Sequence, residues 1–306
     1  MNYIQLAQAI QDYSENTEQL FVLNIPRFII EAEERIYNSV QLPSLRRNVT
    51  GTLTTGNKYV SLPDDWLSNY SVAVIDTTTN NYTYLLNKDV NFLRESYPNP
   101  TDTGLPRYYA LFGSQYSNQN ELSLILAPTP DANYGVELHY FYYPVSIVQG
   151  QAIQLTNLVA GTLYTNGTYT NVPLSGGSGT GITATITVVL NAVASVQINN
   201  PGSLYLVGDT LTVDPAYIGG SGSGFSIDVL NISNSTGTSW LGDNYDPVLF
   251  YGAMREAVIF MKGEQDMVSY YEKMFQDAMS ELKRLGDGLE RGDAYRDGQT
   301  KLKVNT

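Results

Sequence analysis

The chain has 306 residues, of which 42% are hydrophobic, and its formal net charge at pH 7 is −13. This length allows about two domains with a sizeable core, and the negative charge argues against tight phosphate binding by the surface as a whole. The lack of cysteine excludes disulfides, thiolate metal sites and cysteine nucleophiles, and the sequence has neither a signal-peptide pattern nor an apolar run long enough to span a membrane.

The first part of the chain has the periodicity of helices. A short helix is predicted over about Ile4–Gln11. In the next segment apolar residues follow a helical spacing: Ile25, Phe28, Ile29, Ala32 and Ile36. We expect Asn24 to cap this helix and Pro26 to lie in its first turn. The charged residues beside the apolar stripe are expected to face solvent: Glu31, Glu33, Glu34 and Arg35.

From about Asn48 the period changes to two, which predicts strands. The stretch "NVTGTLTTGNKYVSLP" is typical of a hairpin, with its turn near Thr55–Asn57. Further strands are predicted in "YSVAVIDT", "YTYLL", "RYYALFG", "ELSLILAP" and "VELHYFYYP", with one short helix over about Lys88–Ser96. This part is therefore expected to form an antiparallel β domain.

Residues 151–232 differ in composition, because they contain no Lys, Arg or His and only three acids. They include two similar stretches, "GGSGTGITATI" at Gly176–Ile186 and "GGSGSGFSIDV" at Gly219–Val229. Neither stretch has the lysine of a phosphate-binding P-loop or the following helix of a dinucleotide site. Each is interpreted as a turn that leads into a strand, and the segment as an inserted small all-β module.

Helical patterns return near the C-terminus. Asp246 and Pro247 are predicted to begin a helix, as cap and first residue. Apolar residues from Met267 to Leu285 then recur in steps of three and four, which predicts an amphipathic helix of about six turns. The tail from Gly286 is polar, and we expect it not to fold alone.

The fold class predicted from these elements is α+β. Residues 1–49 and 233–306 are expected to form one helical bundle, with the C-terminal tail attached, because no Lys or Arg occurs between Tyr108 and Met254. Residues 50–150 form the antiparallel β domain, and residues 151–232 the inserted β module. This division treats the two helical ends as one body from which the β segments project.

The search for catalytic residues finds no convincing set. His139 is the only histidine and is interpreted as structural. Asp64 and Asp65 are expected to serve a turn or a cap, although a pair such as Asp64 and Glu137 could in principle form a glycosidase carboxylate pair. The acids of "GDNYDP" at Gly242–Pro247 are expected to cap a helix, with a Ca²⁺ site as the weaker alternative. We expect no enzyme activity, no cofactor and no metal.

Several stretches together resemble the head-to-tail adaptor (connector) proteins of tailed bacteriophages, including the tail tubular protein A-like adaptors of short-tailed phages. The stretches occur in this order: Ile25–Arg47, Gly56–Leu67 with "SLPDDWL", Leu105–Gly113, Leu124–Pro144, and Trp240–Arg284 with "LFYGAMREA". No single motif is specific, and the ordered set carries the resemblance. Residues 151–232 depart from the pattern, so the resemblance does not extend to the contacts of that module.

The resemblance implies a structural virion protein at the head–tail junction, assembled in the host cytoplasm. Such adaptors form a ring, usually of twelve subunits, that docks on the portal protein, extends the DNA channel and offers a platform to a downstream tail or nozzle protein and to fibres. DNA would pass without specific binding, and no membrane is involved. The C-terminal segment reaches towards the portal in such adaptors, which implies these portal-docking residues: Arg291, Tyr295, Arg296, Lys301 and Lys303.

Two other functions stay open from the sequence. The protein could be a tail fibre or a receptor- or glycan-binding virion protein that uses the inserted β module for recognition. Against this, fibres tend to be rich in β structure up to the C-terminus, whereas this chain ends in helical patterns. A hydrolase acting on cell-wall or capsule polysaccharide is the third possibility, and it would need two carboxylates in one cleft.

Overall fold

The computed structural model describes residues 1–99, 101–113 and 122–294, with the backbone alone for 287–294. The chain divides into two compact units. Unit 1 comprises Met1–Val40 and Val145–Leu285, and the main part of unit 2 is Gln41–Pro144. Helices lie at both ends of the chain with a mostly antiparallel β region between them, so the predicted α+β fold class is confirmed.

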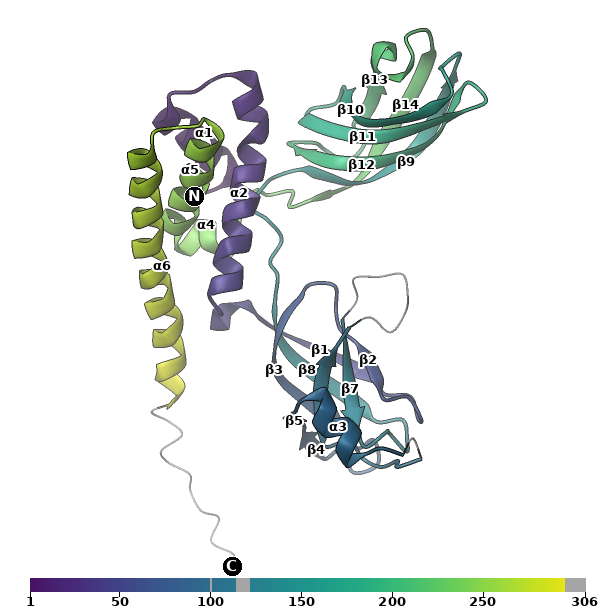
Figure 1. Ribbon diagram of the computed structural model, residues 1–306, viewed down its shortest axis with the longest axis vertical. Helices are drawn as coiled ribbons and strands as arrows, with labels where there is room; N and C mark the ends of the chain where they lie inside the picture. The colour runs from purple at the N-terminus through teal and green to yellow at the C-terminus, as the bar shows by residue number, and fades with distance from the viewer. Residues whose placement is uncertain (100, 114–121, 295–306) are drawn as a thin grey trace, which may run out of the picture. The chain divides into compact units, whose positions relative to one another are not determined.

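The helices of unit 1 come from both ends of the sequence. They are α1 (Tyr3–Ser14), α2 (Gln19–Ser39), α4 (Trp240–Asn244), α5 (Asp246–Phe260) and α6 (Gln265–Ala294). α1 begins with a capping box, in which the Asn2 side chain accepts from the Gln5 backbone N–H and the Gln5 side chain accepts from that of Asn2. Figure 1 shows α1, α2, α5 and α6 gathered in one bundle.

Three expectations about these helices are wrong. α2 begins at Gln19, so Pro26 lies inside the helix and Asn24 is not its cap; burial of Phe21 near the start of α2 favours helix despite the hydrogen bond that proline removes. Asp246 is the first residue of α5 rather than its cap. α6 extends to Ala294, nine residues into the segment expected not to fold.

Close packing and ion pairs hold the bundle together. A Cβ atom placed on Gly252 of α5 would lie 2.9 Å from Cβ of Ala32 in α2, so the two helices approach closely at this glycine. Arg35 of α2 lies 2.9 Å from Glu256 of α5, and Arg255 pairs with Glu256 and with Glu272 of α6. Helix α5 is thereby held to α2 by both apolar and charged contacts, and α6 is held to α5 by the pair of Arg255 and Glu272.

The remaining part of unit 1 is a six-stranded antiparallel sheet. Its strands are β9 (Gln151–Thr162), β10 (Gly167–Ser175), β11 (Thr180–Val189), β12 (Ala192–Ser203), β13 (Thr210–Val213) and β14 (Ser223–Ser233), with a short 3₁₀ helix η2 (Pro215–Ile218). The spatial order is β12-β11-β10-β13-β14-β9. The core lies on the inner face of this curved sheet and includes Tyr164, Ile186, Tyr205, Leu211 and Phe225. Both glycine stretches are turns that lead into β11 and β14, as predicted.

Unit 2 contains two four-stranded sheets. One has the order β1 (Arg46–Thr52), β8 (Gly135–Tyr142), β3 (Trp66–Ile75), β4 (Tyr82–Tyr84); the other has the order β2 (Tyr59–Ser61), β7 (Ser123–Ala127), β6 (Tyr108–Phe112), β5 (Leu86–Asn87). Helix α3 (Val90–Ser96) and a 3₁₀ turn η1 (Pro43–Leu45) complete it. The shared core includes Leu62, Val72, Leu124, Leu138 and Tyr140.

The hairpin predicted over residues 48–63 does not form. The chain turns near Gly56, where Asn57 N–H donates to the Thr54 carbonyl at 3.0 Å. However, β1 pairs with β8 and β2 pairs with β7, so the two strands belong to different sheets. Alternation identifies a strand but does not identify its partner, because any strand with a compatible apolar face can pair.

Candidate functional site

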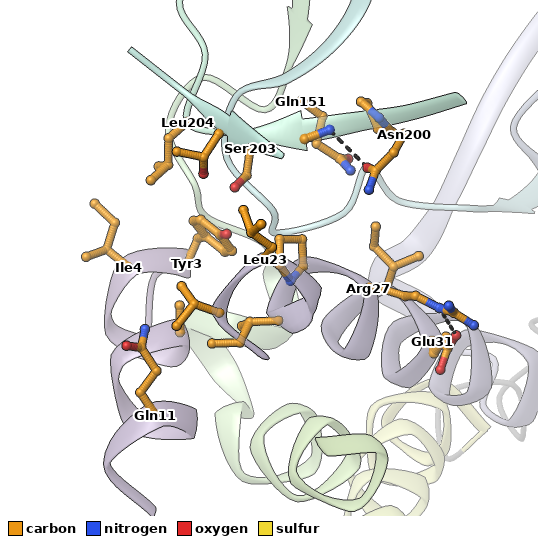
Figure 2. A pocket seen from close by; sticks show the side chains of 18 of the residues that line it. Tyr3, Ile4, Gln11, Leu23, Arg27, Glu31, Gln151, Asn200, Ser203 and Leu204 are labelled. Carbon is orange, nitrogen blue, oxygen red and sulfur yellow. Dashed lines mark hydrogen bonds and ion pairs between the residues drawn. The ribbon is translucent and has the colours of Figure 1, made fainter. Parts of the chain in front are cut away.

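A groove of about 610 Å³ lies within unit 1, where α1 and α2 meet the ends of three strands. Figure 2 shows Tyr3, Ile4 and Leu23 on the helices, with Gln151, Asn200, Ser203 and Leu204 opposite them. The lining mixes aliphatic side chains with amides and hydroxyls. Such a surface can hold a partly apolar chain segment and hydrogen-bond its backbone.

The two sides of the groove are linked by specific contacts. Tyr3 and Ser203 face each other across the groove, and burial is the main cause that raises the pKa of Tyr3. The nearest atom to a Cβ placed on Gly181 would be Cδ2 of Leu23, at 3.4 Å. Arg27 and Glu31 form an exposed i,i+4 ion pair of 2.7 Å on the rim, which contributes little to stability. Within the described lining residues, no nucleophile is paired with a base.

The carboxyl of Glu33 is buried, and it lies on α2, the helix that also contributes residues to the groove. Its Oε1 accepts a hydrogen bond of 2.9 Å from the Ile147 N–H, in the segment that leads into β9. Burial raises the pKa of Glu33 to about 7, and the contacts with Ser146 and Ile147 only partly oppose this. The expectation that Glu33 is solvated is therefore wrong. The helical periodicity identified the apolar stripe of α2, but it could not indicate that the segment containing Ile147 covers a residue beside that stripe.

Two of the acids considered for catalysis, Asp65 and Glu137, have structural partners in unit 2. The Asp65 carboxylate accepts from Arg47 at 2.6 Å and from the Tyr140 hydroxyl at 2.8 Å, and the Asp65 backbone carbonyl accepts from the Tyr143 N–H at 2.7 Å. Glu137 accepts from the Asn48 amide at 2.7 Å. These hydrogen bonds and the ion pair hold each carboxylate in a fixed rotamer, which suits a structural role.

His139 and the acids before the last helices also have places in the fold. His139 Nε2 lies 3.5 Å from Glu137 on the same strand. In "GDNYDP", Asp243 lies inside α4, whose cap is Ser239, and Asp246 opens α5. Among the side chains described, at residues 1–99, 101–113 and 122–286, no three of His, Cys, Asp or Glu come together as a metal site would need.

Sequence reasoning missed a cluster of arginines stacked on aromatic rings in unit 2. The Arg46 guanidinium lies 4.0 Å from the ring centre of Tyr70 and 5.1 Å from that of Phe141. Arg47 lies 3.7 Å from the ring centre of Tyr142. These rings come from β3 and β8, so the clearest sequence signal was the adjacent arginine pair itself, without any indication of its partners.

The residues expected to dock on the portal lie at the end of the chain. Arg291 is in the last turn of α6, where only the backbone is described. Tyr295, Arg296, Lys301 and Lys303 lie outside the described residues. The role of these residues in portal docking therefore stays a prediction. No described helix has both the length and the apolar character needed to cross a bilayer.

Comparison with known proteins gives one family. The model of the SU10 adaptor protein family matches residues 1–171, which is more than half of the chain. The match spans α1, α2, unit 2 and the first strand of the six-stranded sheet, and it ends inside β10. No curated protein matches the chain. This match shows that the chain belongs to the SU10 adaptor protein family, a family of phage structural adaptors.

Proposed function

We propose that this protein forms the head-to-tail adaptor ring of a tailed phage, with about twelve copies related by a closed rotation. The ring docks on the portal protein, extends the DNA channel and presents a platform to a downstream tail or nozzle protein and to fibres. The family match over residues 1–171 carries this proposal. The specific likeness to tail tubular protein A-like adaptors belongs to the same proposal.

The charge of the chain is compatible with passage of DNA. With 30 acidic and 17 basic residues, the subunit repels a polyanion more than it attracts it. Low affinity for phosphate is what a channel wall requires, because tight ionic contacts would retain the DNA. Raised salt should therefore change DNA passage little compared with a basic channel.

Docking on the portal is assigned to the C-terminal tail, through Arg291, Tyr295, Arg296, Lys301 and Lys303. A polar segment with few apolar residues can become ordered when it binds. Its basic groups would pair with carboxylates of the portal. The unit 1 helices then serve as the rigid base from which the tail extends.

The first test is the mass of the complex with the portal protein of the same virus, by mass photometry or native mass spectrometry. About twelve copies on one portal ring support the proposal. A chain that ignores the portal and forms trimers alone would instead favour the fibre or receptor-binding function.

A second test addresses the tail. Truncation after Leu289 should weaken portal binding at least tenfold and leave the circular dichroism spectrum of the folded units nearly unchanged. A full-length variant with Arg296→Glu, Lys301→Glu and Lys303→Glu should show the same loss, whereas Asp293→Asn with Asp297→Asn should not. Unchanged portal affinity in the first two variants would remove the tail from the docking site.

A further inference from the structure

The six-stranded sheet of unit 1 is built from two copies of one three-stranded unit. "GTLY" at Gly161–Tyr164 returns as "GSLY" at Gly202–Tyr205, 41 residues later. The strands β9 and β12 that end in these motifs have 12 residues each. β9, β10 and β11 of the first copy correspond to β12, β13 and β14 of the second. In the strand order β12-β11-β10-β13-β14-β9, each strand and its counterpart lie at equal distances from the middle of the sheet. The sheet therefore has an approximate twofold axis between β10 and β13.

The two copies interlock through their tyrosines. Tyr164 of the first copy accepts a hydrogen bond of 3.2 Å from the Phe225 N–H of the second. Tyr205 of the second copy is bonded in the same way to the backbone of Ile182 in the first. The ring of Tyr164 covers Gly222, and that of Tyr205 covers Gly179. The equivalence thus extends from strands to individual atoms.

The approximate twofold gives the sheet two equivalent ends. The first end, here called the root, contains Leu204 and lies against Tyr3 and Leu23 of the helices in the groove described above. The second end, here called the free tip, consists of Leu163, Val189 and Leu190. Ser178 Oγ donates to the Leu204 carbonyl at the root, and Ser221 Oγ donates to the Leu163 carbonyl at the free tip, so the loops correspond.

The free tip is exposed and apolar. Leu163 is 66% exposed and Leu190 is 88% exposed. Both have left-handed backbone, with φ of 66° and 52°, as Leu204 has at the root with φ of 64°. This conformation is unfavourable for a residue with a branched apolar side chain. At the root the same geometry places Leu204 in the lining of the groove, where it is 39% exposed, whereas at the free tip the leucines are more exposed.

The helical bundle carries a second exposed apolar surface, here called the helical end. It lies where α1 and α5 end and α2 and α6 begin, at the same end of the bundle (Figure 1). The rings of Phe21 and Phe260 lie 6.3 Å apart there, which joins α2 to α5. Its exposed members are Tyr13, Leu20, Phe260, Met267 and Tyr270. Clustered apolar side chains at a surface mark an interaction site.

We propose that the free tip of one copy seats on the helical end of a second copy of this chain. The root supplies the precedent, because the equivalent end of the same sheet already packs on helices. The two surfaces differ, so the contact is head-to-tail, and repetition by a rotation closes a ring. This inference rests on the ring in the proposed function and names the surfaces that build it.

Cysteine crosslinking tests the contact directly, because the chain has no cysteine of its own. A mixture of the full-length Leu190→Cys and Leu20→Cys variants is oxidised and resolved on a non-reducing gel. We expect disulfide-linked heterodimers in this mixture. The control replaces Leu190→Cys by Leu206→Cys, which is 58% exposed in the loop at the root; it should yield at least fivefold less crosslinked product. Equal yields from both mixtures would overturn the inference.

Assembly provides the second readout. Leu163→Ser with Leu190→Ser should raise the concentration needed for half-assembly at least tenfold, and should make loading on the portal ring non-cooperative. Leu206→Ser with Val207→Ser is the matched control and should assemble like the wild type. Identical assembly of both variants and the wild type would refute the inference.

The outcomes separate this inference from the proposed function. Wild-type subunits that load cooperatively on the portal, with no effect of the tip variant, refute the inference alone. Self-association that depends on the tip, without any affinity for the portal, refutes the portal function alone. Intact rings of the tip variant that lose attachment of another virion protein assign the free tip to that protein and also overturn the inference.

Discussion

The buried carboxyl of Glu33 makes the stability of unit 1 depend on pH in a direction opposite to that of most acids. Its pKa is about 7 in the folded protein, against an ordinary value of 4.5. Above pH 7 the folded state must hold a desolvated anion, and below pH 4.5 both states are neutral. The stability associated with Glu33 is therefore present at low pH and is lost as the pH rises through about 7.

The magnitude follows from the two pKa values. At about 1.4 kcal/mol for each pH unit between them, Glu33 should lower the free energy of unfolding by about 2.5 kcal/mol from pH 5 to pH 8. Glu33→Gln keeps an oxygen that can accept from the Ile147 N–H but removes the charge. The variant should therefore gain about 2.5 kcal/mol relative to the wild type over the same pH interval.

The assay is urea unfolding at several pH values, followed by the fluorescence of Trp240 in a Trp66→Phe background, since the chain has two tryptophans and Trp240 lies in unit 1. Glu31→Gln, an exposed position on the same helix, is the control and should change the pH slope by less than about 0.5 kcal/mol. Glu33→Ala should be destabilised at every pH, because the buried Ile147 N–H loses its partner. Equal pH slopes for the wild type and Glu33→Gln would refute the reasoning.

The six-stranded sheet supports three further predictions. Gly222→Ala and Gly179→Ala should each lower the melting temperature of unit 1 and reduce its free energy of unfolding by about 1–3 kcal/mol, because the added methyl group overlaps a tyrosine ring. Gly167→Ala should not have this effect, because its added methyl group meets only ordinary contacts. Tyr205→Phe should cost about 1–3 kcal/mol in urea unfolding, because the buried Ile182 N–H loses its acceptor. Deletion of residues 152–232 should leave cooperative melting of the helices by circular dichroism, because Gln151 and Ser233 are paired neighbours that a short turn can join; broad, non-cooperative melting would contradict it.

Local periodicity was enough to predict the fold class and most elements. The apolar steps from Met267 to Leu285 identified α6, because a helix that packs on one face must repeat near 3.6 residues. The same logic failed at Pro26, where packing of Phe21 outweighs a local helix breaker. It also failed for the strand partners of residues 48–63, because pairing depends on contacts between distant segments.

The groove and the buried carboxyl of Glu33 could not be predicted from local periodicity either, because both depend on contacts between distant segments. Tyr3 and Ser203 meet only in the folded chain, and nothing near either residue in the sequence indicates the other. Glu33 lies among exposed charges, and only its Ile147 partner distinguishes it from them. The glycine repeat was visible, but its meaning required the tyrosines that pack on the glycines of the opposite copy.

The duplicated sheet also shows where selection for folding alone would have produced a different sequence. The position of Leu190 at the free tip corresponds to Gln149 at the root, whose amide donates to the Ser235 carbonyl at 2.9 Å. The root thus has a polar residue that is hydrogen-bonded within the subunit, while the free tip has a leucine that is 88% exposed. The fold of the subunit does not require an exposed leucine with left-handed backbone at this position. A polar residue such as Asn would remove the exposed apolar surface and reduce the backbone strain. The apolar choice at the free tip is explained when a second surface covers it, as contact with the helical end of another copy would do.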